Sequence, residues 1–108
     1  MVSMDSLEER EKGFERKFVS DQELEFRATS RRNRMLGEWA AKLMDLEHVE
    51  EYAQAVVKSH FENPGDEDIL RKVSEDLTAS GLPGAAAEVP SKMDEFLALA
   101  RDQMRSGN

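Results

Sequence analysis

Three arginines of this 108-residue chain are spaced so that their guanidinium groups could act together. Arg27, Arg31 and Arg34 stand at i, i+4 and i+7, and this spacing puts all three on one face of a helix. Guanidinium groups bind phosphates and carboxylates through paired hydrogen bonds. The three arginines therefore form a candidate docking or anion-binding face. The simpler interpretation is a solvated face whose charges pair within the protein.

The other reactive side chains do not form a catalytic or metal site. His48 and His60 lack the i, i+4 spacing of paired metal ligands on a helix. Asp66, Glu67 and Asp68 open a predicted helix, where acids cap backbone N–H groups and suit the helix dipole. The sequence has no cysteine and no Gly-rich phosphate loop. We therefore predict that the chain is not an enzyme and uses no metal and no cofactor.

Composition limits the choice of partner. The net charge is −8, which argues against nucleic-acid binding because that binding depends on neutralising phosphates. No apolar run approaches the roughly 18 residues that span a bilayer. The N-terminus also lacks the apolar core of a signal peptide. We expect a monomeric cytoplasmic protein with no membrane insertion.

The elements that would position the arginines are helices, since no segment alternates polar and apolar residues with period two. The arginines belong to a predicted helix from Asp21 to about Asp45. Its expected core stripe is interrupted by Arg31 and Arg32. The stripe consists of Leu24, Ala28, Met35, Trp39, Leu43 and Leu46.

Three further helices are predicted after this one. The first spans residues 47–61 and ends before Pro64, and the second begins with Asp66 as its cap and stops at Ser80. The last helix begins either near Ala86 or at Pro90. Four helices joined by short turns predict an all-α, four-helix antiparallel bundle over residues 21–104.

Residues 1–20 form a separate N-terminal segment that is either flexible or marginally helical. Capping-box patterns at residues 6–9 and 20–23 favour two helices with a joint near Ser20, and one continuous helix is the alternative. Leu7, Phe14 and Phe18 make only a thin apolar stripe, and so short a helix is marginal alone in water. The segment would therefore gain order by docking, either on the bundle or on a partner.

Four stretches of the sequence resemble one bacterial family, the zeta subunit of alphaproteobacterial F-type ATP synthases. They are R-E-K-G-F-E-R-K-F (10–18), R-R-N-R-M-L-G-E-W-A-A (31–41), N-P-G-D-E-D-I-L-R-K-V (63–73) and K-M-D-E-F-L-A-L-A (92–100). The resemblance implies a regulatory inhibitor of ATP hydrolysis. It also implies that the N-terminal helix wedges into a catalytic interface between the alpha and beta subunits, next to the gamma shaft. The partner would be the soluble catalytic head of the membrane-bound enzyme.

By position, the resemblance assigns inhibition to residues 4–19. The apolar anchors that it implies are Leu7, Phe14 and Phe18. The implied charged contacts are Arg10, Glu11, Lys12, Glu15, Arg16 and Lys17. The alternative function, from the residues alone, is a small helical bundle that binds a phosphate-bearing ligand or nucleotide through Arg27, Arg31 and Arg34.

Overall fold

The computed structural model describes the backbone of residues 2–106 and the side chains of residues 21–106. In this part of the chain the elements are α1 (Val2–Leu43), α2 (Val49–Glu62), α3 (Asp66–Ala79) and α4 (Pro83–Arg105), with no strand. None of these helices, over the residues described, is apolar enough along its length to cross a membrane. The predicted all-α class is confirmed.

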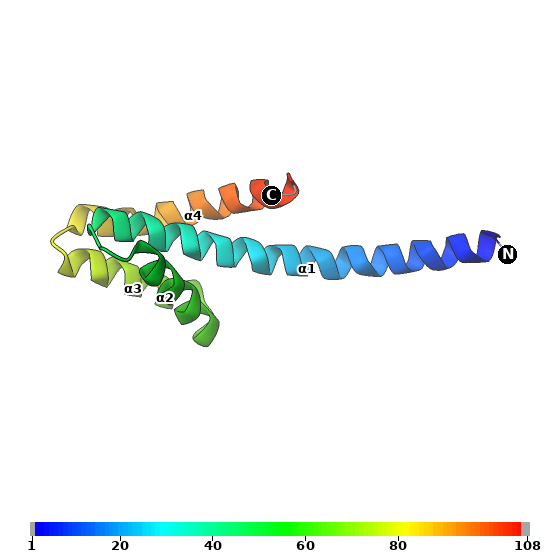
Figure 1. Ribbon diagram of the computed structural model, residues 1–108, viewed down its shortest axis with the longest axis horizontal. Coiled ribbons are helices and arrows are strands. Elements are labelled where there is room, and N and C mark those ends of the chain that lie inside the picture. Colours follow the sequence, from blue (N-terminus) through cyan, green and yellow to red (C-terminus); the bar gives the residue numbers. More distant parts are fainter. Residues whose placement is uncertain (1, 107–108) are drawn as a thin grey trace.

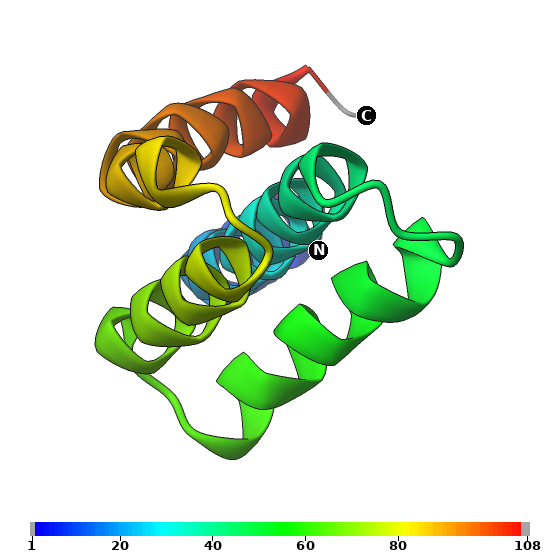
Figure 2. The same cartoon turned by 90° about the vertical axis from the view of Figure 1, so that its left-hand side faces the viewer.

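The four helices run in alternating directions, as the antiparallel prediction requires (Figure 1). An end-on view shows α1 between α2 and α4, with α3 beside α4 (Figure 2). The N-terminal part of α1 projects beyond the other helices, and the molecule is therefore elongated, at 68 × 25 × 23 Å (Figure 1). A four-helix bundle with an N-terminal helical extension is the predicted architecture.

The core is built from all four helices. Large apolar side chains of α3 and α4 supply much of it, including Ile69, Val73, Leu77 and Met93. The remaining members of the main cluster are Leu36, Ala40, Val56 and Val89. Trp39 and Tyr52 pack against this cluster and are only partly buried.

The predicted stripe on α1 is partly wrong. Ala28 is buried, but Leu24, Leu43 and Leu46 are exposed. The buried face instead passes through Ala28, Arg32, Asn33, Leu36, Gly37, Ala40 and Ala41. Small residues let the neighbouring helices approach closely on this face, and Arg32 and Asn33 are buried with hydrogen-bond partners. The prediction weighed large apolar residues and so selected a face rotated by about one residue.

Gly37 lies where α1 packs closely against α2. A Cβ atom at this position would lie 2.7 Å from the Cα of Ala53 and 3.3 Å from Cγ2 of Val56. Contacts this short are not tolerated between a side chain and a backbone atom. The glycine therefore allows the two helix axes to pack more closely than alanine would.

Several boundaries differ from the predictions. α1 is continuous through Ser20, which is the second of the two alternatives, and it ends at Leu43. α3 has Gly65 as its N-cap, with φ at 128°, and Asp66 is its first residue. α4 begins at Pro83, earlier than either predicted start. Proline suits the first turn because its missing N–H would have no helical partner there, and Pro90 lies inside the helix with an exposed side chain.

Candidate functional site

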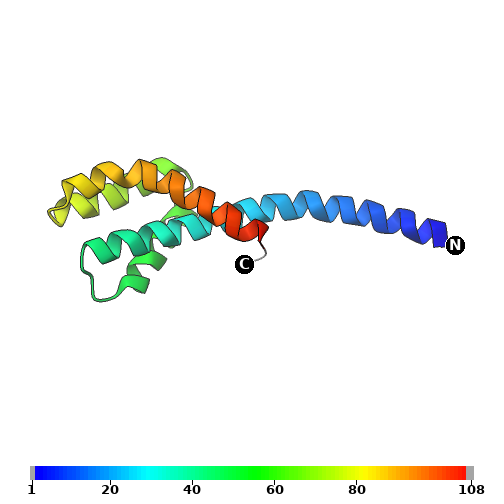
Figure 3. The same cartoon turned by 90° about the horizontal axis from the view of Figure 1, so that it is seen from above.

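The predicted inhibitory segment lies in the projecting part of α1. Two views at right angles show that this part extends past the end of α4, with no other helix beside it (Figures 1 and 3). The proposed contact residues lie outside residues 21–106, the range whose side chains the structure describes. These residues are Leu7, Arg10, Glu11, Lys12, Phe14, Glu15, Arg16, Lys17 and Phe18. Their backbone is an unbroken continuation of the helix that crosses the bundle.

The three arginines of the candidate face reach in different directions. Arg27 pairs with Glu23 at 2.9 Å, along α1 itself. Arg31 donates a hydrogen bond of 3.0 Å to the Oε1 atom of Gln103 on α4. Arg34 pairs with Glu38 on α1, at 3.1 Å, and with Glu50 beside the start of α2.

The arginine spacing therefore does not correspond to one shared anion site in this structure. Arg31 reaches towards α4, whereas Arg34 reaches towards α2, and each guanidinium already has a polar partner. Such contacts fasten α1 to its neighbours at the surface, where each is worth about 0–1 kcal/mol. Binding a phosphate through all three groups would require these partners to be displaced.

Arg32, which interrupted the predicted stripe in the sequence, is buried in the structure. It is 2% exposed and donates from Nε to Oδ1 of Asn33 at 2.7 Å. Its Nη2 donates to Oδ1 of Asp66, the first residue of α3, at 2.8 Å. This contact joins two of the sequence motifs, R-R-N-R and N-P-G-D, across the bundle. Removing a charged side chain from water is costly, so such side chains are buried only when their hydrogen bonds are satisfied.

Asp66 is held in its charged form by its neighbours. The hydrogen bond from Arg32 lowers the pKa of the Asp66 carboxyl, and the charges of Arg32 and His60 act in the same direction against partial burial. Nε2 of His60 lies 3.8 Å from Oδ1 of Asp66. The cluster connects α1, the end of α2 and the start of α3, and its geometry is that of a structural contact.

The single tyrosine and tryptophan also serve the bundle. The hydroxyl of Tyr52 donates a hydrogen bond of 2.7 Å to Asp76 on α3. Burial, with the carboxylate of Asp76 as a further cause, raises the pKa of the Tyr52 phenol. Lys72 lies over the ring of Tyr52, and Lys92 lies over that of Trp39, 5.9 Å from the ring centroid. Both aromatic rings are therefore engaged by their own chain.

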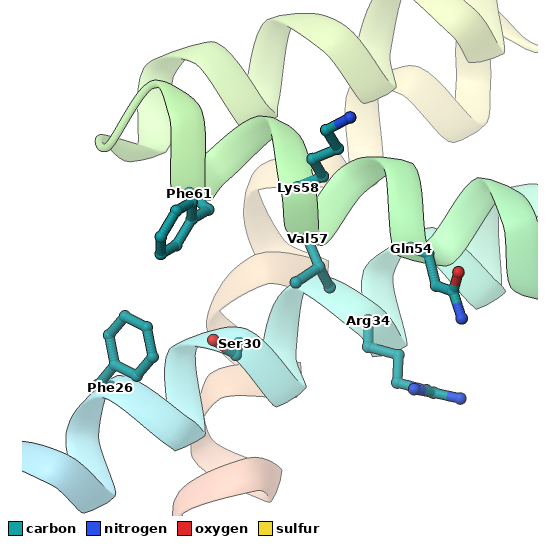
Figure 4. A pocket seen from close by; sticks show the side chains of 7 residues that line it. All are labelled: Phe26, Ser30, Arg34, Gln54, Val57, Lys58 and Phe61. Carbon is teal, nitrogen blue, oxygen red and sulfur yellow. The ribbon is translucent and has the colours of Figure 1, made fainter.

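An apolar groove lies between α1 and α2 in the described part of the chain. Its volume is about 460 Å³, and Phe26 and Phe61 point towards each other across it (Figure 4). These two side chains are 61% and 74% exposed, more than any other large apolar residue among residues 21–106. The other lining residues are Ser30, Arg34, Gln54, Val57 and Lys58.

Two features of the described chain are placed to contact a partner. Over the residues with described side chains, no group of histidines and carboxylates could hold a metal ion. What the surface offers is a projecting helix and an apolar groove at its base. Sequence reasoning missed the groove because Phe26 and Phe61 belong to different helices. The available signal was that neither residue fell on a predicted core stripe.

Comparison with known proteins gives one clear match. A model of the protein family described as ATPase inhibitor subunit zeta matches residues 4–103. No curated protein matches the chain. The matched range covers nearly the whole sequence, including both the projecting part of α1 and the bundle.

Proposed function

The chain belongs to the ATPase inhibitor subunit zeta family, and from this premise we propose that it inhibits ATP hydrolysis by the F-type ATP synthase. In this proposal the N-terminal part of α1 wedges into a catalytic interface between the alpha and beta subunits, next to gamma. The chain acts as a monomer at the soluble head of the membrane-bound enzyme. It needs neither a catalytic residue nor a cofactor, because binding one rotary state better than the others is enough to inhibit.

The projecting part of α1 is the observation that carries the proposal. The buried apolar residues among the described side chains begin at Ala28 and end at Ala100. These residues come from all four helices and form the core of the bundle. A helix that stands clear of its own bundle has its whole circumference available to a partner (Figure 3).

The energetics of docking are compatible with a reversible inhibitor. Ordering a marginal segment on a partner costs on the order of 2–5 kcal/mol. Burying Leu7, Phe14 and Phe18 would return roughly 1.5–3 kcal/mol for each side chain. The surplus is modest, so differences in shape between rotary states can decide which state is bound.

The proposal is tested by adding the pure protein to the isolated ATPase head and measuring ATP hydrolysis. We expect the full chain to lower the rate, and a chain that lacks Met1–Val19 to leave it unchanged. A full-length variant with Leu7, Phe14 and Phe18 changed to serine should need at least about 1,000-fold more protein for the same inhibition.

The matched control changes exposed leucines of the bundle, Leu43→Ser and Leu99→Ser, which are 44% and 46% exposed. This variant should inhibit as the natural chain does. Circular dichroism of the truncated chain checks that the bundle remains folded. Equal inhibition by the full and truncated chains would refute the assignment of inhibition to the N-terminal segment.

A further inference from the structure

The side chains of Phe26 and Phe61, which flank the groove, are exposed although no contact within the bundle requires it. Single exposed leucines are ordinary on a protein surface. Two phenylalanines that flank one groove on neighbouring helices form instead a concave apolar surface, to which Val57 on α2 contributes (Figure 4). Aromatic anchors of this kind dominate the affinity of protein interfaces.

The charges at the groove indicate the chemistry of its occupant. The lining residues include two cations, Arg34 and Lys58, and no carboxylate, although the chain has a net charge of −8. Arg34 is engaged by Glu38 and Glu50. The Lys58 ammonium is 3.8 Å from Glu62, and its side chain is 76% exposed, so this pair contributes little. Lys58 is therefore the cation best able to exchange its partner for an incoming carboxylate.

The position of the groove on α1 indicates which protein supplies the occupant. Position 26 follows the last proposed anchor, Phe18, by eight residues, which is about 12 Å further along the helix axis and about 80° around it. α1 has no break between these positions. A protein that holds the projecting helix as far as residue 19 therefore has its surface close to the groove.

We propose that the Phe26–Phe61 groove is a second docking site for the ATPase head, and that it receives an apolar segment of the head with a carboxylate beside it. This inference rests on the proposed function and adds a contact of the bundle to that of the projecting helix. The groove supplies affinity and fixes the orientation of the bundle. Inhibition itself remains with the N-terminal segment.

The test compares two full-length double variants in binding to the immobilised ATPase head. Phe26→Ser with Phe61→Ser should raise the Kd at least tenfold, and both side chains are exposed enough for the bundle to stay folded. Leu43→Ser with Leu99→Ser should leave the Kd unchanged. At saturating concentration the groove variant should still inhibit hydrolysis fully, because its N-terminal segment is intact.

A charge reversal tests the nature of the occupant. Lys58→Glu should raise the Kd several-fold, and more strongly at low salt, because it places a carboxylate against a carboxylate. Lys42→Glu reverses an exposed lysine at the end of α1, away from the groove, and should have no effect. Tighter binding of the Lys58 variant would overturn the proposed chemistry.

The outcomes separate the two proposals. If the natural chain inhibits and the Phe26/Phe61 variant binds equally well, the groove proposal fails and the proposed function stands. If the natural chain does not bind the head, both fail. Sedimentation showing that the natural chain is a dimer and the groove variant a monomer would assign the groove to a second copy. A lower Kd for the variant would mean that the chain's own N-terminal segment covers the groove, which also overturns the proposal.

Discussion

Arg32 and Asp66 differ greatly in exposure, although they form one ion pair. The side chain of Arg32 is 2% exposed and that of Asp66 is 65% exposed. The guanidinium stays charged in every folded protein, so it depends on Asn33 and Asp66 to replace the water that it has lost. Removing the charge of Asp66 should therefore cost more than the removal of an equally exposed carboxylate elsewhere.

We predict that Asp66→Asn lowers the free energy of unfolding by about 1–2 kcal/mol at pH 7. The value is held down by the solvent that screens the exposed side of the carboxylate. Asp68→Asn is the matched control, because Asp68 is in the same first turn of α3 and pairs with Arg71 at the surface. It should cost less than about 0.5 kcal/mol in the same urea titration.

The loss at Asp66 should also depend on pH. The pKa of Asp66 is lower in the folded chain than its ordinary value of 3.8, so the unfolded chain binds the proton more readily. The stabilisation is complete above about pH 5 and is lost as the pH falls through the folded pKa. The natural chain and Asp66→Asn should then converge in stability below pH 3.8. A gap that stays constant from pH 7 to pH 3 would contradict this account.

At the scale of the elements, the α1–α2 contact depends on the absence of one methyl group. Gly37→Ala would gain about 1 kcal/mol of helix propensity. Against this, the new Cβ would lie 2.7 Å from a backbone atom of Ala53, so the helices must separate and lose packing. Overpacking of this kind typically costs 1–3 kcal/mol.

We predict a net loss of up to about 2 kcal/mol for Gly37→Ala, measured by urea denaturation. Gly84→Ala is the control, since Gly84 is also helical and a Cβ there would meet nothing within 4 Å. That variant should be at least as stable as the natural chain. If Gly37→Ala were as stable as Gly84→Ala, the close approach of α1 to α2 would not constrain position 37.

Local sequence patterns predicted those elements whose core residues are large and apolar. Asp66 and Ser80 marked the ends of α3 to within one residue, and its buried Ile69, Val73 and Leu77 recur at helical spacing. On α1 the buried face consists mainly of small and polar residues, with Leu36 as its one large apolar member. The spacing of Leu24, Leu43 and Leu46 instead predicted a different face, on which these leucines are exposed. The start of α4 was missed because both predicted starts, Ala86 and Pro90, lie after Pro83, which is the first residue of the helix.

The candidate site was predictable only in part, for a related reason. The spacing of Arg27, Arg31 and Arg34 identified a set of charges, but their partners Gln103 and Glu50 come from distant parts of the sequence. The groove likewise combines Phe26 with Phe61. Contacts between helices depend on their packing, and the periodicity of one helix does not report it.

At the scale of the whole molecule, α1 belongs to two environments. From about Ala28 onwards it is covered by α2 and α4, whereas its N-terminal part has no helix beside it (Figures 1 and 3). Helices without tertiary packing are marginal in water, even when their sequence favours them. The two parts of one helix should therefore differ greatly in local stability.

We predict that backbone amides of residues 4–20 exchange with deuterium about 100-fold or more faster than those of residues 32–41 in the free protein. Binding to the ATPase head should slow exchange in the first range and leave the second unchanged. The measurement is hydrogen exchange by mass spectrometry with and without the head. Equal protection of the two ranges in the free chain would show that the N-terminal segment is covered by some other contact.

The continuity of α1 through Ser20 has a mechanical consequence. Under the proposed function, the ATPase head holds the N-terminal end of a helix about 63 Å long. The C-terminal part of the same helix is packed against α2 and α4. A sideways force from the rotating gamma subunit would then be transmitted along α1 to Leu36 and Ala40 in the core, because the helix has no break between its N-terminal end and these residues. The resistance to rotation would then depend on how strongly α2 and α4 pack against α1.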